Sequence, residues 1–525
     1  MLSANFKILI KFLNTVSHLK PIQVVYQLKN RFSNSALLSV YYKDFRKTEN
    51  QLLFSSLPKI NTVLAVLDNE YQFTFLNQDK TFSSKIDWGD EGYGKLWNYN
   101  LQYVDFLRQE DVSEKVKLSL LSDLYSALEQ GTLKLEPYPV SLRIMNVIRF
   151  MNQQENKDEL LQKRVFGEVN YLSKHLEYHL LGNHLLENGF ALLMGGHFFK
   201  NPVWITLAEK LLKKELDEQI LDDGAHFELS PMYHQIILFR VLEVLDYLPS
   251  ENPCYGIFHT VAKRMINWLK SISFDNGDIP HFNDSIDGIA FTTKQLIGLA
   301  VKFKISPDLK TLLKSSGYRK LKTNNLELVA DVHGISPDYQ PGHAHADSLS
   351  FVLYAYGQPF VVDMGISTYQ IGAKRSLERS TLAHNTVTID DKNTAEVWSG
   401  FRVGKRPKVK IVASTDNSIE ASLSFEKFEH NRLFNIESNA LTIKDKVNSD
   451  KLAVSRLYLH PKVEVNLIDS GKIEFSNGSI LLISNEVEVM VNDYEYNTGY
   501  NCQVPAKCLE IKFKGECSIK FLEKT

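Results

Sequence analysis

The stretch Pro341–Phe351 (PGHAHADSLSF) places two imidazoles and a carboxylate within five residues. His343 and His345 are two residues apart, so the alternation of side chains along a strand would place them on one face. Asp347 has the same parity, and the SLSFVLYAYG segment that begins one residue later is apolar and typical of a buried strand. The pattern predicts a polar site that is supported by a rigid sheet.

Asp363 and His384 follow shortly afterwards, within FVVDMG and LAHNTVTID. A histidine, an aspartate and a second histidine brought together from neighbouring strands would supply the nitrogen and oxygen ligands that zinc prefers. The alternative is that these histidines only form hydrogen bonds within turns. We favour a zinc site because several side chains of the right type occur close together in the sequence.

Two stretches farther upstream carry polar residues that the packing of a helical core does not explain. In GNHLLENGFALLMGGHFF (Gly182–Phe199), Asn183 and His184 occur where a helix is expected to begin. Their types and position make them candidate site residues. The alternative is a capping arrangement formed by these two residues and Glu187.

The second stretch is DDGAHFELSPMYHQ (Asp222–Gln235). Ser230 is suited to cap a helix and Pro231 to occupy its first position. Tyr233 would then project from the first turn, near the positive end of the helix dipole, where a phenolate is favoured. The alternative is that Tyr233 is an ordinary packed aromatic residue.

The elements that must position these residues divide the chain into three parts. Residues 1–95 are expected to form a helical and irregular arm. Residues 96–322 carry serial amphipathic helices with short breaks, which indicate stacked helical hairpins in an open solenoid or a closed toroid. Residues 323–525 carry short alternating segments separated by turn residues, which predict a large antiparallel sandwich. The site is expected at the interface between the helices and the sandwich.

Composition narrows the class of protein. At 525 residues the chain is too long for one ordinary core. A formal net charge of -2 provides no overall positive electrostatic field that would attract nucleic acid or an anionic membrane, so any basic groove must be local. The four cysteines form no CxxC pair and are expected to be reduced packing residues.

The N-terminal segment and the hydropathy of the chain indicate where in the cell the protein is expected to be. Residues 1–50 combine apolar residues at helical spacing with basic ones, and we expect them to clamp onto the body, the alternative being contact with a membrane surface. No run approaches the roughly 20 apolar residues that span a bilayer. The opening residues fit an amphipathic helix better than a secretory signal, which favours the cytoplasm over the periplasm.

Seven segments in order give the chain a resemblance to the heparinase II/III family of polysaccharide lyases. The resemblance implies an incomplete α/α toroid followed by an antiparallel β-sandwich, and lyase activity on uronate-containing glycans. The opening HLKPIQVVYQLKNRF also resembles relatives associated with bacterial surface-polysaccharide production. The seven segments are LWNYNLQYVDFL, EPYPVSLRIMN, GNHLLENGFAL, FELSPMYH, PGHAHADSLSF, VVDMGISTY and RSTLAHNTVTID.

The resemblance assigns roles residue by residue. The implied catalytic residues are the carboxylate-neutralising pair Asn183 and His184, the tyrosine Tyr233, the histidine His343 and a second tyrosine, Tyr369. The implied metal ligands are His345, Asp363 and His384, which would hold a structural divalent ion, zinc. The expected substrate-binding residues are Arg375, Arg379, Trp97 and Asn188, the last as an alternative to Asn183.

These roles lead to β-elimination, in which a base takes the C5 proton of a uronate and the C4 oxygen leaves. Tyr233 or His343 would be the base, depending on the configuration at C5, and Tyr233 would protonate the leaving oxygen. The partner is expected to be an acidic polysaccharide or oligosaccharide and not nucleic acid. Two alternatives remain open, a uronyl C5-epimerase and a non-catalytic glycan-binding or assembly protein, and the oligomeric state is undetermined.

Overall fold

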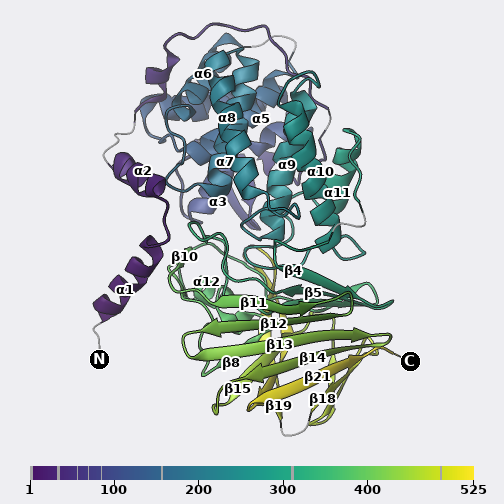
Figure 1. Cartoon of the computed structure of the whole chain (residues 1–525). Coiled ribbons are helices and arrows are strands. Elements are labelled where there is room, and N and C mark those ends of the chain that lie inside the picture. Colours follow the sequence, from purple (N-terminus) through teal and green to yellow (C-terminus); the bar gives the residue numbers. More distant parts are fainter. Residues whose placement is uncertain are drawn as a thin grey trace.

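The computed structural model describes residues 4–31, 36–55, 57–68, 70–83, 85–154, 158–308, 312–484 and 487–524. A body of helices lies on one end of a body of sheets, and two helices at the N-terminus run along one flank of both (Figure 1). The helical body precedes the sheet body in the chain, as the sequence pattern predicts.

The N-terminal part contributes helices and a small sheet. Strands β1, β2 and β3 form an antiparallel sheet in that order, and Phe73, Phe75 and Phe82 from it join the same apolar core as the helices. The predicted arm is therefore helical at its start but part of the helical domain at its end. The elements are α1 (Ala4–Val16), α2 (Pro21–Arg31), η1 (Leu38–Tyr42), β1 (Leu64–Leu67), β2 (Glu70–Phe75) and β3 (Gln78–Phe82).

The helical domain packs consecutive helices against one another, with α7 on α8, α9 on α10 and α5 on α7. Polar caps fix several of their starts: Ser113 accepts from Val116 N–H, and Thr292 and Gln295 form a capping box. The elements are α3 (Lys95–Tyr103), η2 (Asp105–Arg108), α4 (Glu114–Gln130), α5 (Pro137–Met151), α6 (Glu159–Leu172), α7 (Gly182–Phe198), α8 (Pro202–Gln219), α9 (Pro231–Tyr247), α10 (Tyr255–Ile272) and α11 (Thr293–Val301).

The sheet domain begins with a four-stranded antiparallel sheet and two short helical segments. The sheet has the order β4-β5-β6-β7, and an isolated bridge from Val361 to Leu459 joins it to a second four-stranded sheet. The elements of this first part are β4 (Tyr318–Lys322), β5 (Leu326–Asp331), β6 (Phe351–Ala355), β7 (Gln358–Val361), α12 (Ala373–Glu378), η3 (Thr381–Ala383), β8 (Val387–Ile389), β9 (Val397–Trp398) and β10 (Arg402–Val403).

The second four-stranded sheet has the order β19-β20-β15-β8, and an eight-stranded sheet has the order β11-β12-β13-β14-β21-β18-β17-β16. Buried residues from all three sheets, among them Leu353, Phe434 and Leu509, form one apolar core, which makes the domain a sandwich. The remaining strands are β11 (Lys408–Ser414), β12 (Ser418–Phe425), β13 (Phe428–Glu437), β14 (Ala440–Val447), β15 (Ala453–Tyr458), β16 (Val465–Asp469), β17 (Lys472–Phe475), β18 (Ile480–Ile483), β19 (Glu488–Gly499), β20 (Cys502–Phe513) and β21 (Glu516–Leu522).

The expected boundary after residue 322 is a few residues late. Strand β4 ends at Lys322 and pairs along its whole length with β5, from Tyr318 opposite Asp331 to Lys322 opposite Glu327. This strand therefore belongs to the sheet domain. Its sequence, YRKLK, is too short and too polar to show the alternation that marks the later strands.

Candidate active site

The loop between β5 and β6 carries both predicted histidines. His343 and His345 lie in turns and not in a strand, so strand alternation does not explain why they are close together. Instead, both rings converge on one carboxylate: His343 Nδ1 lies 2.8 Å from Asp284 Oδ2, and His345 Nε2 lies 2.8 Å from Asp284 Oδ1. Asp284 thus organises this side of the site.

Asp284 lies between α10 and α11 and is fully buried. Arg375 of α12 donates to both of its oxygens, with Nη2 2.7 Å from Oδ2. Burial alone would raise the pKa of Asp284, but Arg375 and the two imidazoles outweigh it and hold the pKa well below its usual range. The carboxylate therefore remains charged and accepts hydrogen bonds from both histidines.

The contact with Asp284 fixes the tautomer of His343. Because a carboxylate only accepts, His343 donates from Nδ1, and in the neutral ring the lone pair is then on Nε2. That nitrogen lies 3.4 Å from Asn183 Nδ2 and 3.8 Å from Glu228 Oε2. The basic nitrogen of His343 thus points across the interface toward the helical domain.

Tyr233 occupies the first turn of α9, where the Ser230 side chain accepts its backbone N–H at 3.2 Å. Its ring lies against the His343 ring, with centroids 3.9 Å apart, and its hydroxyl is 3.2 Å from the Tyr369 hydroxyl. Burial raises the pKa of Tyr233 well above its usual value. Desolvation, which opposes the helix dipole, thus favours the protonated phenol over the expected phenolate.

Asn183 and His184 begin α7 and point to different neighbours. Asn183 Nδ2 lies 3.1 Å from both carboxylate oxygens of Glu228, and its backbone N–H donates to the same group. His184 Nδ1 lies 3.1 Å from Glu177 Oε1. Burial alone would lower the pKa of His184, but Glu177 outweighs it and raises that pKa. The amide of Asn183, unlike the imidazole of His184, contacts His343 directly.

Tyr369 closes the site from the sheet domain. Its ring lies 6.0 Å from the His343 ring and packs on Phe401 and Tyr500 with centroids 5.3 and 5.4 Å away. The guanidinium of Arg375 lies 4.9 Å from the Tyr369 centroid. The two predicted tyrosines are therefore direct neighbours, although one comes from each domain.

The four residues expected to bind substrate are buried and have partners within the protein, and their role in substrate binding stays a prediction. Arg375 binds Asp284, and Arg379 donates to the Ala344 carbonyl at 2.8 Å. Both arginines position the histidine loop. Desolvation beside Arg375 lowers the pKa of Arg379 to about 9.

Asn188 and Trp97 are likewise internal. Asn188 has no exposed surface and holds Glu177, accepting its backbone N–H at 2.8 Å and donating to its Oε2 at 2.9 Å. It therefore does not replace Asn183 as the amide of the site. Trp97 is a core residue that packs on Phe75.

Three carboxylates that organise the site, Asp284, Glu228 and Glu177, were not predicted. Each is an isolated acidic residue in the sequence, and each faces a predicted residue only through the tertiary fold. Glu228 lies within the FELSPMYH segment, two residues before Ser230, where the helix was expected to start. That position was the one signal in the sequence that Glu228 belongs to the site.

Two of the predicted metal ligands present free nitrogens. His345 Nδ1 and His384 Nε2 are buried without a hydrogen-bond partner, and the two rings lie 5.3 Å apart. Asp363 Oδ2 instead lies 2.6 Å from His384 Nδ1. No group of three ligating side chains is assembled among the residues that the structure describes. Imidazole donors with a carboxylate on the far nitrogen of each ring, Asp284 for His345 and Asp363 for His384, nonetheless suit zinc.

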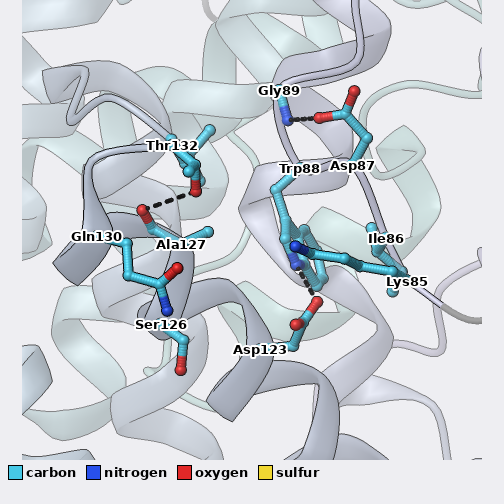
Figure 2. A pocket seen from close by; sticks show the side chains of 11 residues that line it. Lys85, Ile86, Asp87, Trp88, Gly89, Asp123, Ser126, Ala127, Gln130 and Thr132 are labelled. Atoms are coloured by element: carbon cyan, nitrogen blue, oxygen red, sulfur yellow. Dashed lines mark hydrogen bonds between the residues drawn. The ribbon is translucent and has the colours of Figure 1, made fainter.

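A separate pocket of about 330 Å³ lies on the helical domain, between the loop 85–89 and α4 (Figure 2). Trp88 donates its indole N–H to Asp123 at 2.8 Å beside it. Lys85, Gln130 and Thr132 contribute polar groups to the lining. None of the residues predicted for the chemistry lines this pocket, so it is distinct from the site at the domain interface.

Comparisons with curated proteins find lyases. A heparin-sulfate lyase of Bacteroides stercoris is 23% identical over 420 residues, covering 72% of this chain and 61% of the relative. A heparin-sulfate lyase of Pedobacter heparinus is 26% identical over 343 residues, covering 58% and 49%. The chain therefore spans less than two thirds of the length of either relative.

Solved structures show the same architecture. Heparinase III superposes with a TM-score of 0.65 at 17% identity, covering 82% of this chain and 76% of that one. A mutant heparan sulfate lyase from Pedobacter heparinus gives 0.59 at 18% identity, covering 86% and 81%. The predicted fold, a helical toroid followed by an antiparallel sandwich, is confirmed.

The family matches extend over almost the whole chain. Residues 23–310 match the family described as Heparinase II/III N-terminus, and residues 306–521 match Heparinase II/III-like, C-terminal. The chain belongs to the heparinase II/III family.

Proposed function

We propose that the protein is a polysaccharide lyase that cleaves a uronate-containing glycan by β-elimination. The observation that carries the proposal is the convergence of three groups from two domains: the Asn183 amide, the Tyr233 phenol and the His343 imidazole. A base, an acid and a carboxylate donor are the groups that this elimination needs.

His343 is the proposed base. Its Nε2 lone pair accepts the C5 proton of the uronate, and the electrons of the C5–H bond form the C4–C5 double bond. Asp284, bound to Nδ1, stabilises the imidazolium that results. General bases of this kind contribute about 100- to 10,000-fold to a rate.

Tyr233 is the proposed acid. As the C4–O bond breaks, the phenol gives its proton to the leaving oxygen, and the raised pKa keeps that proton available. The Tyr369 hydroxyl, 3.2 Å away, stabilises the phenolate that forms. The proton held by His343 and the charge on Tyr233 are then neutralised through solvent.

Asn183 and His184 are the proposed carboxylate donors. Negative charge grows on the uronate carboxylate as C5 loses its proton, and N–H donors aimed at that charge lower the barrier. Glu228 accepts from Asn183 Nδ2, which orients the amide with its nitrogen toward His343. Removing one such donor typically costs about 100- to 1000-fold in rate.

We also propose a structural divalent ion, zinc, bound by His345 and His384 with Asp363 as the carboxylate partner of His384. The support is the pair of buried free nitrogens and the donor types. Such an ion would fix the loops that present His343 and takes no part in the elimination. Elemental analysis of the purified protein should find about one zinc per chain, and less in His345→Ala; an equal content in both would contradict the site.

The proposed substrate class is an acidic glycan with uronate residues, such as a glycosaminoglycan or a bacterial surface polysaccharide. The names of the curated relatives, both heparin-sulfate lyases, support this class. The partly exposed imidazole of His184, whose pKa Glu177 raises against the effect of burial, adds an N–H donor that suits a carboxylate.

The experiment is a screen of the purified protein on uronate polymers in deuterated water. A lyase releases unsaturated products that absorb in the ultraviolet. Deuterium at C5 without chain cleavage would instead identify an epimerase. Glycan binding without either change would contradict the catalytic proposal.

A further inference from the structure

Helix α1 attaches to the body through its polar side. Asn14 Nδ2 donates to Glu396 Oε2 at 3.3 Å, and the Trp398 indole donates to Thr15 Oγ1 at 3.1 Å. Both partners belong to the loop and hairpin around β9 and β10, which lie beside α1 (Figure 1). The hydrogen bonds that join α1 to the body thus come from its polar residues.

Helix α2 is attached in the same way. Gln23 is buried and donates to the Tyr339 carbonyl at 3.3 Å, and Asn30 Nδ2 lies 3.0 Å from His179 Nδ1. These two polar residues are seven positions, or about two turns, apart, so they mark one side of the helix as the side that meets the body.

The apolar side of each helix is exposed as a result. Amphipathic helices of globular proteins direct this side to the core, whereas here the side chains concerned keep 41% to 60% of their surface in contact with solvent. Exposed apolar patches of this kind mark interaction sites. We define the arm face as Ile8, Leu9, Phe12 and Leu13 of α1 with Val24, Val25 and Leu28 of α2.

The segment that forms α1 and α2 is also more basic than the rest of the chain. Residues 4–31 contain Lys7, Lys11, Lys20, Lys29 and Arg31 and no acidic residue, while the whole chain carries a formal net charge of -2. Docking of a second copy through the same face would bring like charges together, which is unfavourable. Anionic lipid headgroups complement this charge, at about 1 kcal/mol for each Lys or Arg near the surface.

We propose that the arm face is a docking surface for an anionic lipid bilayer. In this arrangement α1 and α2 lie along the membrane, their apolar side chains enter the boundary between headgroups and acyl chains, and the basic residues other than Lys20, which pairs with Glu218, contact lipid phosphates. The structure suits surface attachment: among the described residues, no helix is long and apolar enough to cross a bilayer. The proposal is independent of the lyase chemistry.

Vesicle flotation of the full chain tests the proposal, with vesicles of pure phosphatidylcholine and vesicles that also contain phosphatidylglycerol. Wild type should float with the anionic vesicles and much less with the neutral ones. Leu9→Glu with Leu13→Glu should weaken the partition by about tenfold per leucine. Lys7→Gln with Lys29→Gln should weaken it by about fivefold per lysine.

A matched control is Leu160→Glu with Val203→Glu, which changes helix residues of comparable exposure, 49% and 70%, outside the arm. This variant should float as wild type does. Far-ultraviolet circular dichroism would show that every variant is folded. The proposal is overturned if wild type does not float with anionic vesicles, if Leu9→Glu with Leu13→Glu floats normally, or if those changes abolish a dimer instead.

Discussion

A buried aspartate binds an arginine and a histidine in two places in the molecule. Both aspartates accept from two nitrogens of a guanidinium and from imidazole, one ring for Asp445 and two for Asp284, and both clusters are almost completely buried. The interface cluster consists of Asp284, Arg375 and His343, and the sandwich cluster consists of Asp445, Arg432 and His430.

The surroundings of the two clusters differ. In the sandwich cluster, Arg432 lies directly opposite Asp445 on neighbouring strands β13 and β14, and the sheet ladder sets the pair. In the interface cluster the three residues come from two loops and α12, and His343 reaches Asn183 and Tyr233 of the other domain. The comparison shows that the clusters differ at the second imidazole nitrogen: that of His343 lies 3.4 Å from Asn183 Nδ2, whereas that of His430 is buried without a hydrogen-bond partner.

The largest difference is expected for the histidines. His343→Gln removes the base, so kcat/KM on a cleaved glycan should fall by about 100- to 10,000-fold. His430→Gln should leave kcat/KM within about threefold and mainly lower the free energy of unfolding, by about 1–3 kcal/mol. Equal catalytic losses in the two variants would show that the comparison is wrong.

Substitution of Asp284 should likewise lower kcat more than substitution of Asp445, but by a smaller factor than for the histidines. Asp284→Asn weakens the orientation of His343, and kcat should fall by about 10- to 100-fold, as for other carboxylates that orient a working imidazole. Asp445→Asn leaves Arg432 buried without a counter-charge, which should cost about 3–5 kcal/mol of stability. Steady-state kinetics and urea unfolding of both variants measure this, and a stability loss in Asp445→Asn below that of a surface substitution would count against it.

The smallest expected effect is on the pH dependence of stability. Burial alone would raise the pKa of Asp445, but Arg432 and His430 outweigh it and lower that pKa. Stability from this group is therefore present above its unfolded pKa of about 3.9 and is lost as the pH falls further. Unfolding free energies measured between about pH 5 and pH 3 should fall more steeply for wild type than for Asp445→Asn; parallel curves would contradict the lowered pKa.

Much of the fold could be predicted from the sequence because the apolar residues of each half recur with one dominant spacing. Helices such as α10 carry apolar residues at three-to-four spacing, and strands such as β12 alternate between buried and partly exposed residues. Strand β4 was assigned to the wrong domain because its pattern is short. The inverted packing of α1 was not predicted, because amphipathicity shows which side is apolar but not which side meets the body.

The site was predicted in part. Asn183, Tyr233 and His343 lie in segments whose residue types stand out from ordinary core packing, and the fold brings them together. Asp284 was missed because its partners lie 59 and 91 residues away in the chain, and no local pattern links them. Arg375 was predicted to bind substrate because only tertiary structure shows that Asp284 already holds it.

The comparison of Tyr233→Phe with Tyr171→Phe tests the central claim most directly. Both changes remove one hydroxyl from the helical domain, where Tyr233 meets Tyr369 and Tyr171 donates to the Leu135 carbonyl at 3.0 Å. On a glycan that wild type cleaves, Tyr233→Phe should release unsaturated product at least about 100-fold more slowly, while Tyr171→Phe keeps the wild-type rate. Full activity in a folded Tyr233→Phe protein would contradict the claim that the two domains meet to form an elimination site.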